Sequence, residues 1–356
     1  MPDRYFMPAE WEPHEATWIA WPHNRRDWPG KMGPIPWVFG EMVRKLVPGE
    51  IVRIIVQDAN HEAAATRVLR RAAVDLGRVE FVRIATNRGW TRDMGPIFVR
   101  RGSRRGPLMV ADFAFNAWAK YPDYRDDNRV AARAAKKLGV PSVRPMVRDK
   151  PLVLEGGAID VNGRGTLLTT EQCLLDNTQQ ARNPHLSQAE LEAALKTWLG
   201  LTNIFYLGEG IAGDDTGGHI DDLCRFVNAS TVVVVSESNA KDENYRPLCD
   251  ARERLEGFRL EDGGRAEVVS LPSPAPLMFD GVRLPASYVN FYIGNEAVLV
   301  PTFNDPADRT ALGILSELFP RRDVVGIHAA DLVWGFGTVH CLTQQQPAVK
   351  GQGSGA

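Results

Sequence analysis

One cysteine near the end of the sequence stands in a setting that suits nucleophilic chemistry. Cys341 closes the run GFGTVHC and is followed by LTQQ. Glycines let a backbone approach a ligand closely, and a thiol beside polar residues is better placed for attack than one inside an apolar run. A lone cysteine is nevertheless more often structural, and strand geometry would turn the adjacent His340 to the other side. No comparable setting surrounds the other cysteines, which we expect to be buried apolar side chains: Cys173, Cys224 and Cys249.

The run GGHIDD, residues 217–222, offers a proton shuttle beside a carboxylate. If Ile220 lies in a strand, His219 and Asp221 project to the same face, as an acid–base pair requires. The alternatives are a structural histidine beside a surface aspartate, and a metal ligand. The remaining histidines show no HExxH or similar ligand spacing, so we expect no metal.

Two further carboxylates stand where strand-like runs give way to turn signals. Asp93 lies in WTRDMGP, and Glu155 lies in LEGGA. Binding residues gather on loops of this kind, although a turn-capping aspartate and a solvated strand-edge glutamate would produce the same patterns. Each carboxylate is ambiguous by itself. Their joint presence with the histidine and the cysteine strengthens the case for an active site.

The elements that must position these residues alternate along the whole chain. Apolar runs of strand length, rich in Val and Ile, separate helical patterns at 35–47, 61–77, 127–139, 187–199, 245–257 and 306–319. Ser187 and Glu190 form a capping box ahead of the fourth helix. No low-complexity spacer divides the chain. We therefore expect one α/β domain, residues 1–347, of repeated units that deliver polar loops to a shared centre, with a disordered tail at 348–356.

The composition argues against several classes of function. The 356 residues carry 42 Lys and Arg against 44 Asp and Glu, a formal net charge of -2, so no overall field attracts nucleic acid or an anionic membrane. The first residues lack the apolar run of a secretory signal, and no stretch approaches the ~20 apolar residues of a membrane helix. We therefore expect a cytoplasmic protein, for which a small cationic partner remains compatible. Four scattered cysteines without CxxC spacing indicate neither a disulfide framework nor a zinc cluster.

An ordered set of motifs covers nearly the whole chain. It runs from MPAEWEPHEATWIAWPHN through WTRDMGP, FNAWAKYP, LEGGAID, LLTTEQCLL, NPHLS, DDTGGHIDD and VPTFNDP to GTVHCLTQQQP. Together these motifs resemble the guanidine-modifying enzymes, the family of arginine, agmatine and peptidylarginine deiminases, and within it most of all the agmatine deiminases. The resemblance implies a five-bladed α/β propeller, the pentein fold, with pseudo-fivefold symmetry and an active site at its centre.

A guanidinium group sets clear demands on a site. It stays charged at any working pH and presents its N–H groups in a fixed fork, so carboxylates that accept two parallel bonds hold it best. Its carbon is a poor electrophile, which favours a thiolate nucleophile. The resemblance assigns Cys341 as nucleophile, His219 as acid–base group, and Asp93 and Asp221 as the carboxylates that hold the guanidinium. By the same resemblance, Glu155 holds the histidine ring.

The resemblance also implies hydrolysis of a small cationic guanidino substrate without any cofactor. Agmatine and water would give N-carbamoylputrescine and ammonia through a covalent thiouronium on the cysteine. Trp90 and Asp215 match family positions near the substrate's tail. However, DDTGGH stands where many agmatine deiminases have DETNGH, so the substrate could instead be free or peptidyl arginine or another guanidino compound.

Three other functions remain as alternatives. An amidinotransferase would pass the same intermediate to an amine instead of water. A papain-like protease would need a CGSCW-like stretch, which the sequence lacks. A binding module of the same fold would need neither the thiol nor the histidine. Members of the resembled family often associate, which leaves a homo-oligomer open.

Overall fold

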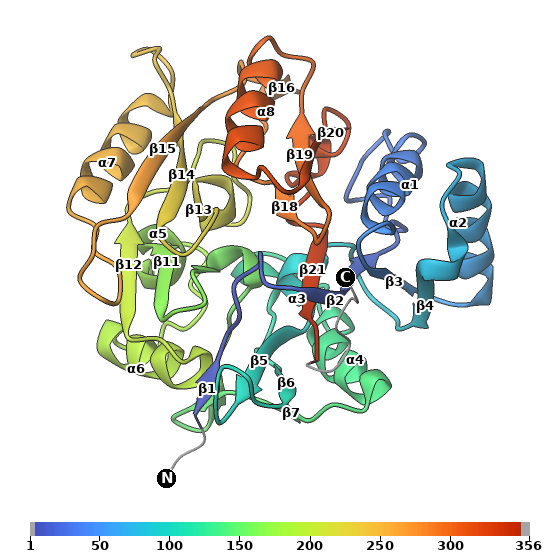
Figure 1. Cartoon of the computed structure of the whole chain (residues 1–356), viewed down its shortest axis with the longest axis horizontal. Helices are drawn as coiled ribbons and strands as arrows, with labels where there is room; N and C mark the ends of the chain where they lie inside the picture. The colour runs from blue at the N-terminus through green and yellow to red at the C-terminus, as the bar shows by residue number, and fades with distance from the viewer. Residues whose placement is uncertain (1–3, 350–356) are drawn as a thin grey trace.

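The structure is a computed structural model that describes residues 4–349 (Figure 1). Helices and short strands alternate along the chain, which confirms the predicted α/β class. The main helices are α1 (Ile35–Leu46), α2 (Ala59–Arg71), α4 (Val130–Leu138), α5 (Glu171–Leu175), α6 (Gln188–Leu199), α7 (Tyr245–Glu256) and α8 (Ala307–Leu318). No helix among residues 4–349 is long and apolar enough to cross a membrane. Of the predicted tail, residues 350–356 lie outside the described part of the chain.

The six predicted helices are all present, and their errors lie at the ends. The second was predicted to reach residue 77 but ends at Arg71, because Ala73 takes a left-handed φ of 56° that a helix does not tolerate. The predicted capping box is confirmed: the Ser187 hydroxyl accepts from the Glu190 N–H, and the Glu190 carboxylate accepts from the Ser187 N–H.

Five sheets of three or four strands share one order. In each, a central strand pairs antiparallel with one neighbour and parallel with the other, and at least one helix connects the two parallel strands. Three of these sheets are β10 (Asp160–Val161), β11 (Thr166–Thr170) and β12 (Asn203–Leu207); β13 (Cys224–Phe226), β14 (Thr231–Ser236) and β15 (Glu267–Pro272); and β18 (Tyr292–Ile293), β19 (Ala297–Thr302) and β20 (Asp323–His328).

The other two sheets follow the same order and add an edge strand each. They are β1 (Tyr5–Phe6), β5 (Ile97–Arg101), β6 (Leu108–Ala111) and β7 (Ser142–Val143); and β21 (Thr343–Pro347), β2 (His14–Ala20), β3 (Ile51–Val56) and β4 (Val79–Arg83). Two small hairpins stand apart from the sheets: β8 (Met146–Val147) with β9 (Lys150–Pro151), and β16 (Met278–Phe279) with β17 (Val282–Arg283).

The last of these sheets joins the two ends of the sequence. Strand β21 runs antiparallel to β2, with Trp18 opposite Gln344, and the two strands lie side by side in Figure 1. The Trp18 indole N–H donates to the Gln346 side-chain oxygen at 2.9 Å, so side chains reinforce the backbone pairing. Cys341 stands two residues before β21 and is thereby held against the N-terminal part of the chain.

The central strands are buried on both faces, which is why they read as continuous apolar runs. In β14, Val232, Val233 and Val234 are all fully buried, although neighbours in a strand point to opposite sides. Burying such a side chain contributes about 1.5–3 kcal/mol relative to leaving it exposed. The strands therefore form a rigid frame for the loops that follow them.

Short helical turns, rather than strands, carry the polar motifs. These turns are α3 (Thr91–Met94), η4 (Gly156–Ala158) and η5 (Ile220–Asp222). Ile220 lies in η5, so the strand geometry on which the pairing of His219 and Asp221 was argued does not apply. Asp93, expected on an open loop, lies instead in the buried turn α3. In such turns successive side chains point in different directions around the helix axis instead of alternating between two faces as in a strand.

Candidate active site

The five predicted catalytic side chains meet in one buried cluster, although they come from four separate segments of the chain. The His219 Nδ1 lies 3.9 Å from Asp93 Oδ1 and 3.9 Å from Asp221 Oδ1, and its Nε2 lies 4.0 Å from Glu155 Oε2. The Cys341 sulfur lies 3.9 Å from Asp221 Oδ2. All five side chains are buried, so neither a surface aspartate nor a solvated strand-edge glutamate describes them.

The loop before His219 is shaped by one aspartate and two glycines. Asp214 Oδ2 accepts from the N–H groups of Gly218 (2.7 Å) and His219 (2.9 Å), and its Oδ1 accepts from the N–H of Thr216 (2.7 Å). Gly217 and Gly218 have φ values of 82° and 95°, which side chains rarely tolerate. The GGH sequence thus turns the histidine ring inward.

A glycine also makes room for that ring. A Cβ on Gly157 would lie 2.4 Å from His219 Nδ1 and 2.9 Å from Asp93 Oδ1, well inside van der Waals contact. The Gly157 N–H donates to Asp93 Oδ1 at 3.1 Å. The second glycine of LEGGA therefore lets the histidine and the aspartate approach, and it helps to orient the aspartate.

Asp93 is held at both carboxylate oxygens. Its Oδ2 accepts from the indole N–H of Trp118 at 2.9 Å, while Oδ1 accepts from Gly157. Burial, together with the neighbouring charges of Asp221 and Glu155, raises the pKa of Asp93 to about 6, against the opposing effect of His219. Residue-level reasoning missed Trp118, whose only signal was its place in FNAWAKYP.

Asp221 has the opposite tendency. Burial acts to raise its pKa, but His340 and His219 outweigh that effect and lower it. The Asp221 Oδ2 lies 2.7 Å from His340 Nδ1, whereas Oδ1 has no hydrogen-bond partner among the described residues. Strand alternation, which would turn His340 away from the site, does not apply here, because β21 begins only at Thr343 and residues 340–341 form a turn.

Cys341 is a buried thiol in acidic surroundings. Burial and the charges of Asp221, Asp222 and Asp93 raise the pKa of Cys341 well above its ordinary value. The Asn290 side-chain N–H donates to the sulfur at 3.2 Å. These effects favour the neutral thiol, and a cation bound between the carboxylates would favour the thiolate.

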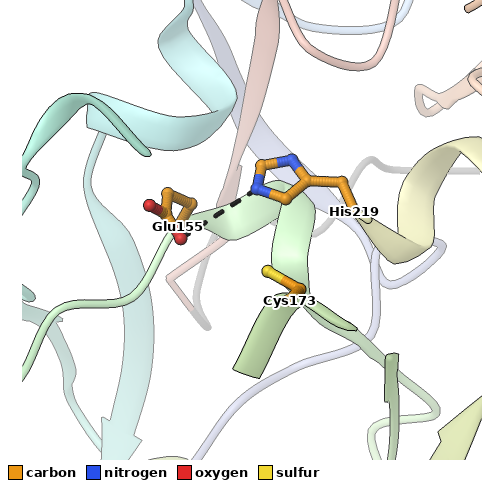
Figure 2. A group of neighbouring side chains, drawn as sticks. All are labelled: Glu155, Cys173 and His219. Atoms are coloured by element: carbon orange, nitrogen blue, oxygen red, sulfur yellow. Dashed lines mark ion pairs between the residues drawn. The ribbon is translucent and has the colours of Figure 1, made fainter. Parts of the chain in front are cut away.

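His219 is favoured in its charged form. Burial acts against the charge, but Asp93, the Cys173 thiol and Asp221 together raise the pKa of His219 well above its ordinary value. Figure 2 shows Glu155 facing the ring, with the Cys173 sulfur beside both. Cys173 lies in α5 and is buried, as expected, but its place beside the histidine was missed. Its only signal was the motif LLTTEQCLL.

An arginine that sequence reasoning also missed fixes Glu155. The Arg182 Nε donates to Glu155 Oε1 at 3.1 Å, and its other nitrogens donate to the carbonyl groups of Gln180 (2.9 Å) and Thr216. Arg182 thus ties Glu155 to the loop that precedes His219. The second oxygen of Glu155, Oε2, has no hydrogen-bond partner among the described residues and faces the histidine Nε2.

A cavity of about 460 Å³ opens onto the cluster. Trp90, Asp93, Asp215 and Cys341 all line it. Trp90 is a buried wall that packs on Trp28, with ring centroids 5.2 Å apart. Asp215 stands among the lining residues and accepts hydrogen bonds from Lys120 Nζ (2.6 Å) and the Tyr121 hydroxyl (2.7 Å). The two predicted tail-binding residues therefore share the cavity with the thiol.

Two sets of side chains in this site present metal-ligand types. The ligand atoms of Glu155, Cys173 and His219 lie within 4.8 Å of one another, as do those of Asp221, Asp222 and Cys341. Thiolate, imidazole and carboxylate together would suit Zn²⁺. The first set, however, already has the Arg182 cation on its glutamate, and every member of the two sets belongs to the cluster around His219 and Cys341.

Comparison with known proteins places the chain in a family. It matches the family described as Porphyromonas-type peptidyl-arginine deiminase over residues 6–347. The protein named agmatine deiminase from Pseudomonas aeruginosa (strain LESB58) is 37% identical over 370 residues, covering 97% of this chain and 96% of the relative. The corresponding protein of Ectopseudomonas mendocina (strain ymp) is 37% identical over 374 residues, covering 98% and 97%.

Solved structures agree with the sequence comparison. The agmatine deiminase of Enterococcus faecalis has 30% identity and a TM-score of 0.87, covering 97% of this chain and 96% of that one. The substrate-bound agmatine deiminase of C. jejuni has 30% identity and a TM-score of 0.85, with 97% of each chain covered. The match extends over nearly the full length in every case. This chain belongs to the Porphyromonas-type peptidyl-arginine deiminase family.

Proposed function

We propose that this chain hydrolyses agmatine to N-carbamoylputrescine and ammonia. One observation carries the proposal: Cys341 and Asp93 line the same cavity, and Asp221 and His219 contact them. The Cys341 sulfur lies 3.9 Å from Asp221 Oδ2, and His219 Nδ1 lies 3.9 Å from both aspartates. Two carboxylates and a nucleophile around one small space suit a flat cation with several N–H groups. The names of the relatives add that proteins with this sequence pattern act on agmatine.

Binding of the guanidinium prepares the nucleophile. Asp93 and Asp221 accept its N–H groups, and the unpartnered Oδ1 of Asp221 gains a donor. The substrate's positive charge then offsets the acidic surroundings that keep Cys341 neutral, so the thiol can lose its proton. Substrate binding and thiolate formation are therefore coupled.

Hydrolysis then proceeds in two stages. In the first, the Cys341 sulfur bonds to the guanidinium carbon, His219 gives a proton to one nitrogen, and the C–N bond breaks to release ammonia. In the second, His219 takes a proton from water, whose oxygen bonds to the same carbon. The C–S bond then breaks, the added hydroxyl group gives up its proton to solvent, and the ureido product and the original thiolate remain. Glu155 and Arg182 hold the ring in place between the two proton transfers.

The outer part of the cavity favours a substrate that ends in an ammonium group. Five aspartates and two arginines line the cavity. Both arginines among the described lining residues lie near carboxylates: Arg88 pairs with Asp27 at 2.9 Å and with Asp123 at 3.2 Å, and the largely exposed Arg26 lies 3.9 Å from Asp123. Neither is therefore held in place for the α-carboxylate of free arginine. Trp90 supplies an apolar wall for a butyl chain, and Asp215 supplies a carboxylate for its amine.

We further propose that the five sheets are the blades of a five-bladed α/β propeller with pseudo-fivefold symmetry. Their common strand order supports this arrangement, as does the view in Figure 1, where they stand around a central region. The proposal treats residues 1–347 as one deiminase domain. The expected cytoplasmic location and homo-oligomer stay predictions.

A ureido assay on the purified protein tests the function. Agmatine, arginine, an arginyl peptide and short guanidino acids are compared at equal concentrations, with Cys341→Ala as the control. We expect agmatine to lead by orders of magnitude and the alanine variant to be inactive. A preference for arginyl peptides would instead favour the activity in the family's name. Ammonia release without an acceptor amine separates hydrolysis from amidino transfer.

A further inference from the structure

A buried histidine stands between two carboxylates at the edge of the proposed active site. The His340 Nδ1 lies 2.7 Å from Asp221 Oδ2, and its Nε2 lies 2.8 Å from Glu10 Oε2. The ring is almost fully buried, so both contacts are shielded from bulk solvent. An ionised carboxylate only accepts hydrogen bonds, and an imidazole can donate from both nitrogens only when it carries two protons.

Glu10 is fixed as an anion by its other contacts. Burial acts to raise its pKa, but Arg225, His340 and Arg92 lower the pKa of Glu10 well below its ordinary value. Its Oε1 lies 2.9 Å from Arg225 Nη2 and accepts from the Ile293 N–H at 2.8 Å, and its Oε2 accepts from Arg92 at 3.0 Å. Glu10 therefore accepts from His340 and cannot supply a proton to it.

The same reasoning applies on the Asp221 side. His340 and His219 hold Asp221 in its ionised form against the effect of burial. With two ionised partners, a neutral His340 would point a nitrogen lone pair at a carboxylate oxygen less than 3 Å away. The geometry fits an imidazolium that donates one hydrogen bond to each partner.

This contact also decides which oxygen of Asp221 is left for a ligand. Oδ2 is engaged by His340, while Oδ1 is buried without a hydrogen-bond partner among residues 4–349 and lies 3.9 Å from His219 Nδ1. A buried acceptor without a donor is costly, so it favours a ligand that brings a donor to it. A guanidinium N–H is such a donor.

We propose that His340, anchored by Glu10, is a positioning residue that keeps Asp221 charged and turned so that its unpartnered oxygen meets the guanidinium. This inference rests on the proposed deiminase function and adds two residues to it, from the first and last segments of the chain. Without His340, Asp221 would face Asp93, Asp222 and the Cys341 thiol with only His219 and Arg225 to offset the negative charge.

The test compares three variants by steady-state kinetics with agmatine. His340→Gln removes the charge and keeps one donor, and Glu10→Gln removes the anchor's charge and keeps an acceptor. His14→Gln is the matched control, because His14 is also buried between a glutamate, Glu50 (3.3 Å), and the carbonyl oxygen of Glu10 (2.6 Å) but does not contact Asp221.

In His340→Gln we expect kcat/KM to fall on the order of 10²-fold, with KM rising more than kcat falls, because the substrate's cation loses a fixed carboxylate. The acidic limb of the kcat/KM profile should move to higher pH, since an unsupported Asp221 takes up a proton more readily. Glu10→Gln should shift both quantities in the same direction by less. Equal losses in His14→Gln and His340→Gln, with an unmoved acidic limb, would show that His340 only stabilises the fold.

A spectroscopic measurement keeps the inference independent of the substrate. In protein labelled with ¹⁵N-histidine, the His340 signal should report a ring with two N–H groups under the assay conditions, and that signal should be absent from His340→Gln. A neutral ring would overturn the inference whatever the substrate is. Conversely, a doubly protonated His340 in a protein that hydrolyses no guanidino compound would support the contacts of His340 with Asp221 and Glu10 and would refute only the proposed function.

Discussion

Asp93 and Asp221 are the same side chain in two different electrostatic settings. Asp93 has a pKa raised to about 6 by burial and by neighbouring carboxylates, whereas Asp221 has a lowered pKa because two histidines face it. At neutral pH both are ionised. As the pH falls, Asp93 takes up a proton before Asp221 does. The attraction between Asp93 and a bound guanidinium therefore weakens first.

The pH dependence of kcat/KM follows from this difference. Activity should decline as the pH falls through about 6, because protonated Asp93 accepts one hydrogen bond fewer and no longer offsets the substrate's charge. Asp93→Asn should lower kcat/KM by on the order of 10²–10³-fold at neutral pH. Its remaining acidic limb should lie at lower pH, since Asp221 then sets it. A limb that stays in place would mean that another group controls it.

The thiol offers a second test at this scale. Because burial and three aspartates raise the pKa of Cys341, the substrate-free protein should show little thiolate absorbance near neutral pH. Adding guanidinium ion, which carries the charged group of the substrate without its alkyl chain, should increase that absorbance. Cys341→Ser measures the contribution of the other cysteines. No increase in the wild-type protein would show that the bound cation does not activate the nucleophile.

At the scale of the elements, glycines decide how closely the active turns approach one another. Gly157 in η4 lets His219 and Asp93 meet across it. By contrast, a Cβ on Gly313 in helix α8 would meet nothing within 4 Å. Gly157 is therefore required by the close packing of the site, whereas Gly313 affects only the stability of its helix.

Substituting these glycines should give opposite results. Gly157→Ala should reduce kcat at least about 100-fold, because the new methyl group displaces the histidine ring from the reacting atoms. Gly313→Ala should leave kcat unchanged and raise the free energy of unfolding by about 0.5–1 kcal/mol. Steady-state kinetics and urea unfolding measure the two effects. Full activity in Gly157→Ala would show that His219 need not stay where the structure has it.

The elements also mark where sequence reasoning succeeds. Helix positions followed from apolar periodicity and from caps such as Ser187, which act within a few residues. The turn conformations did not follow. Reasoning from strand alternation misplaced Ile220, which lies in η5, and the side of His340, which contacts Asp221. Both errors arose because contacts between distant segments, rather than local propensity, fix these backbones.

For the whole molecule, the order of motifs was enough to predict the α/β class and the set of residues that gather. It did not reveal that Glu10 and Arg182 support this set, since each is separated from its partner by a chain distance that no local pattern spans. Neither stands beside a glycine-rich turn as the predicted residues do. Buried ion pairs of this kind become visible only once the sheets are placed.

Truncation tests the role of the last strand. A chain that ends at Ala348 keeps β21 and its pairing with β2, and it should retain the activity and the stability of the full chain. A chain that ends at Leu342 lacks β21, whose residues are all buried, and should fail to fold. Circular dichroism and the ureido assay distinguish these outcomes. An active protein ending at Leu342 would show that the pairing of the two ends is dispensable.

The pairing of β21 with β2 has a consequence for synthesis. Cys341 and the strand that seats it leave the ribosome after Asp93, Glu155, His219 and Asp221 have already emerged. Until that strand emerges, the growing chain lacks both the Cys341 nucleophile and the strand pairing that completes the fold. Catalytic competence arrives in a single late step, when the final strand docks against one of the first.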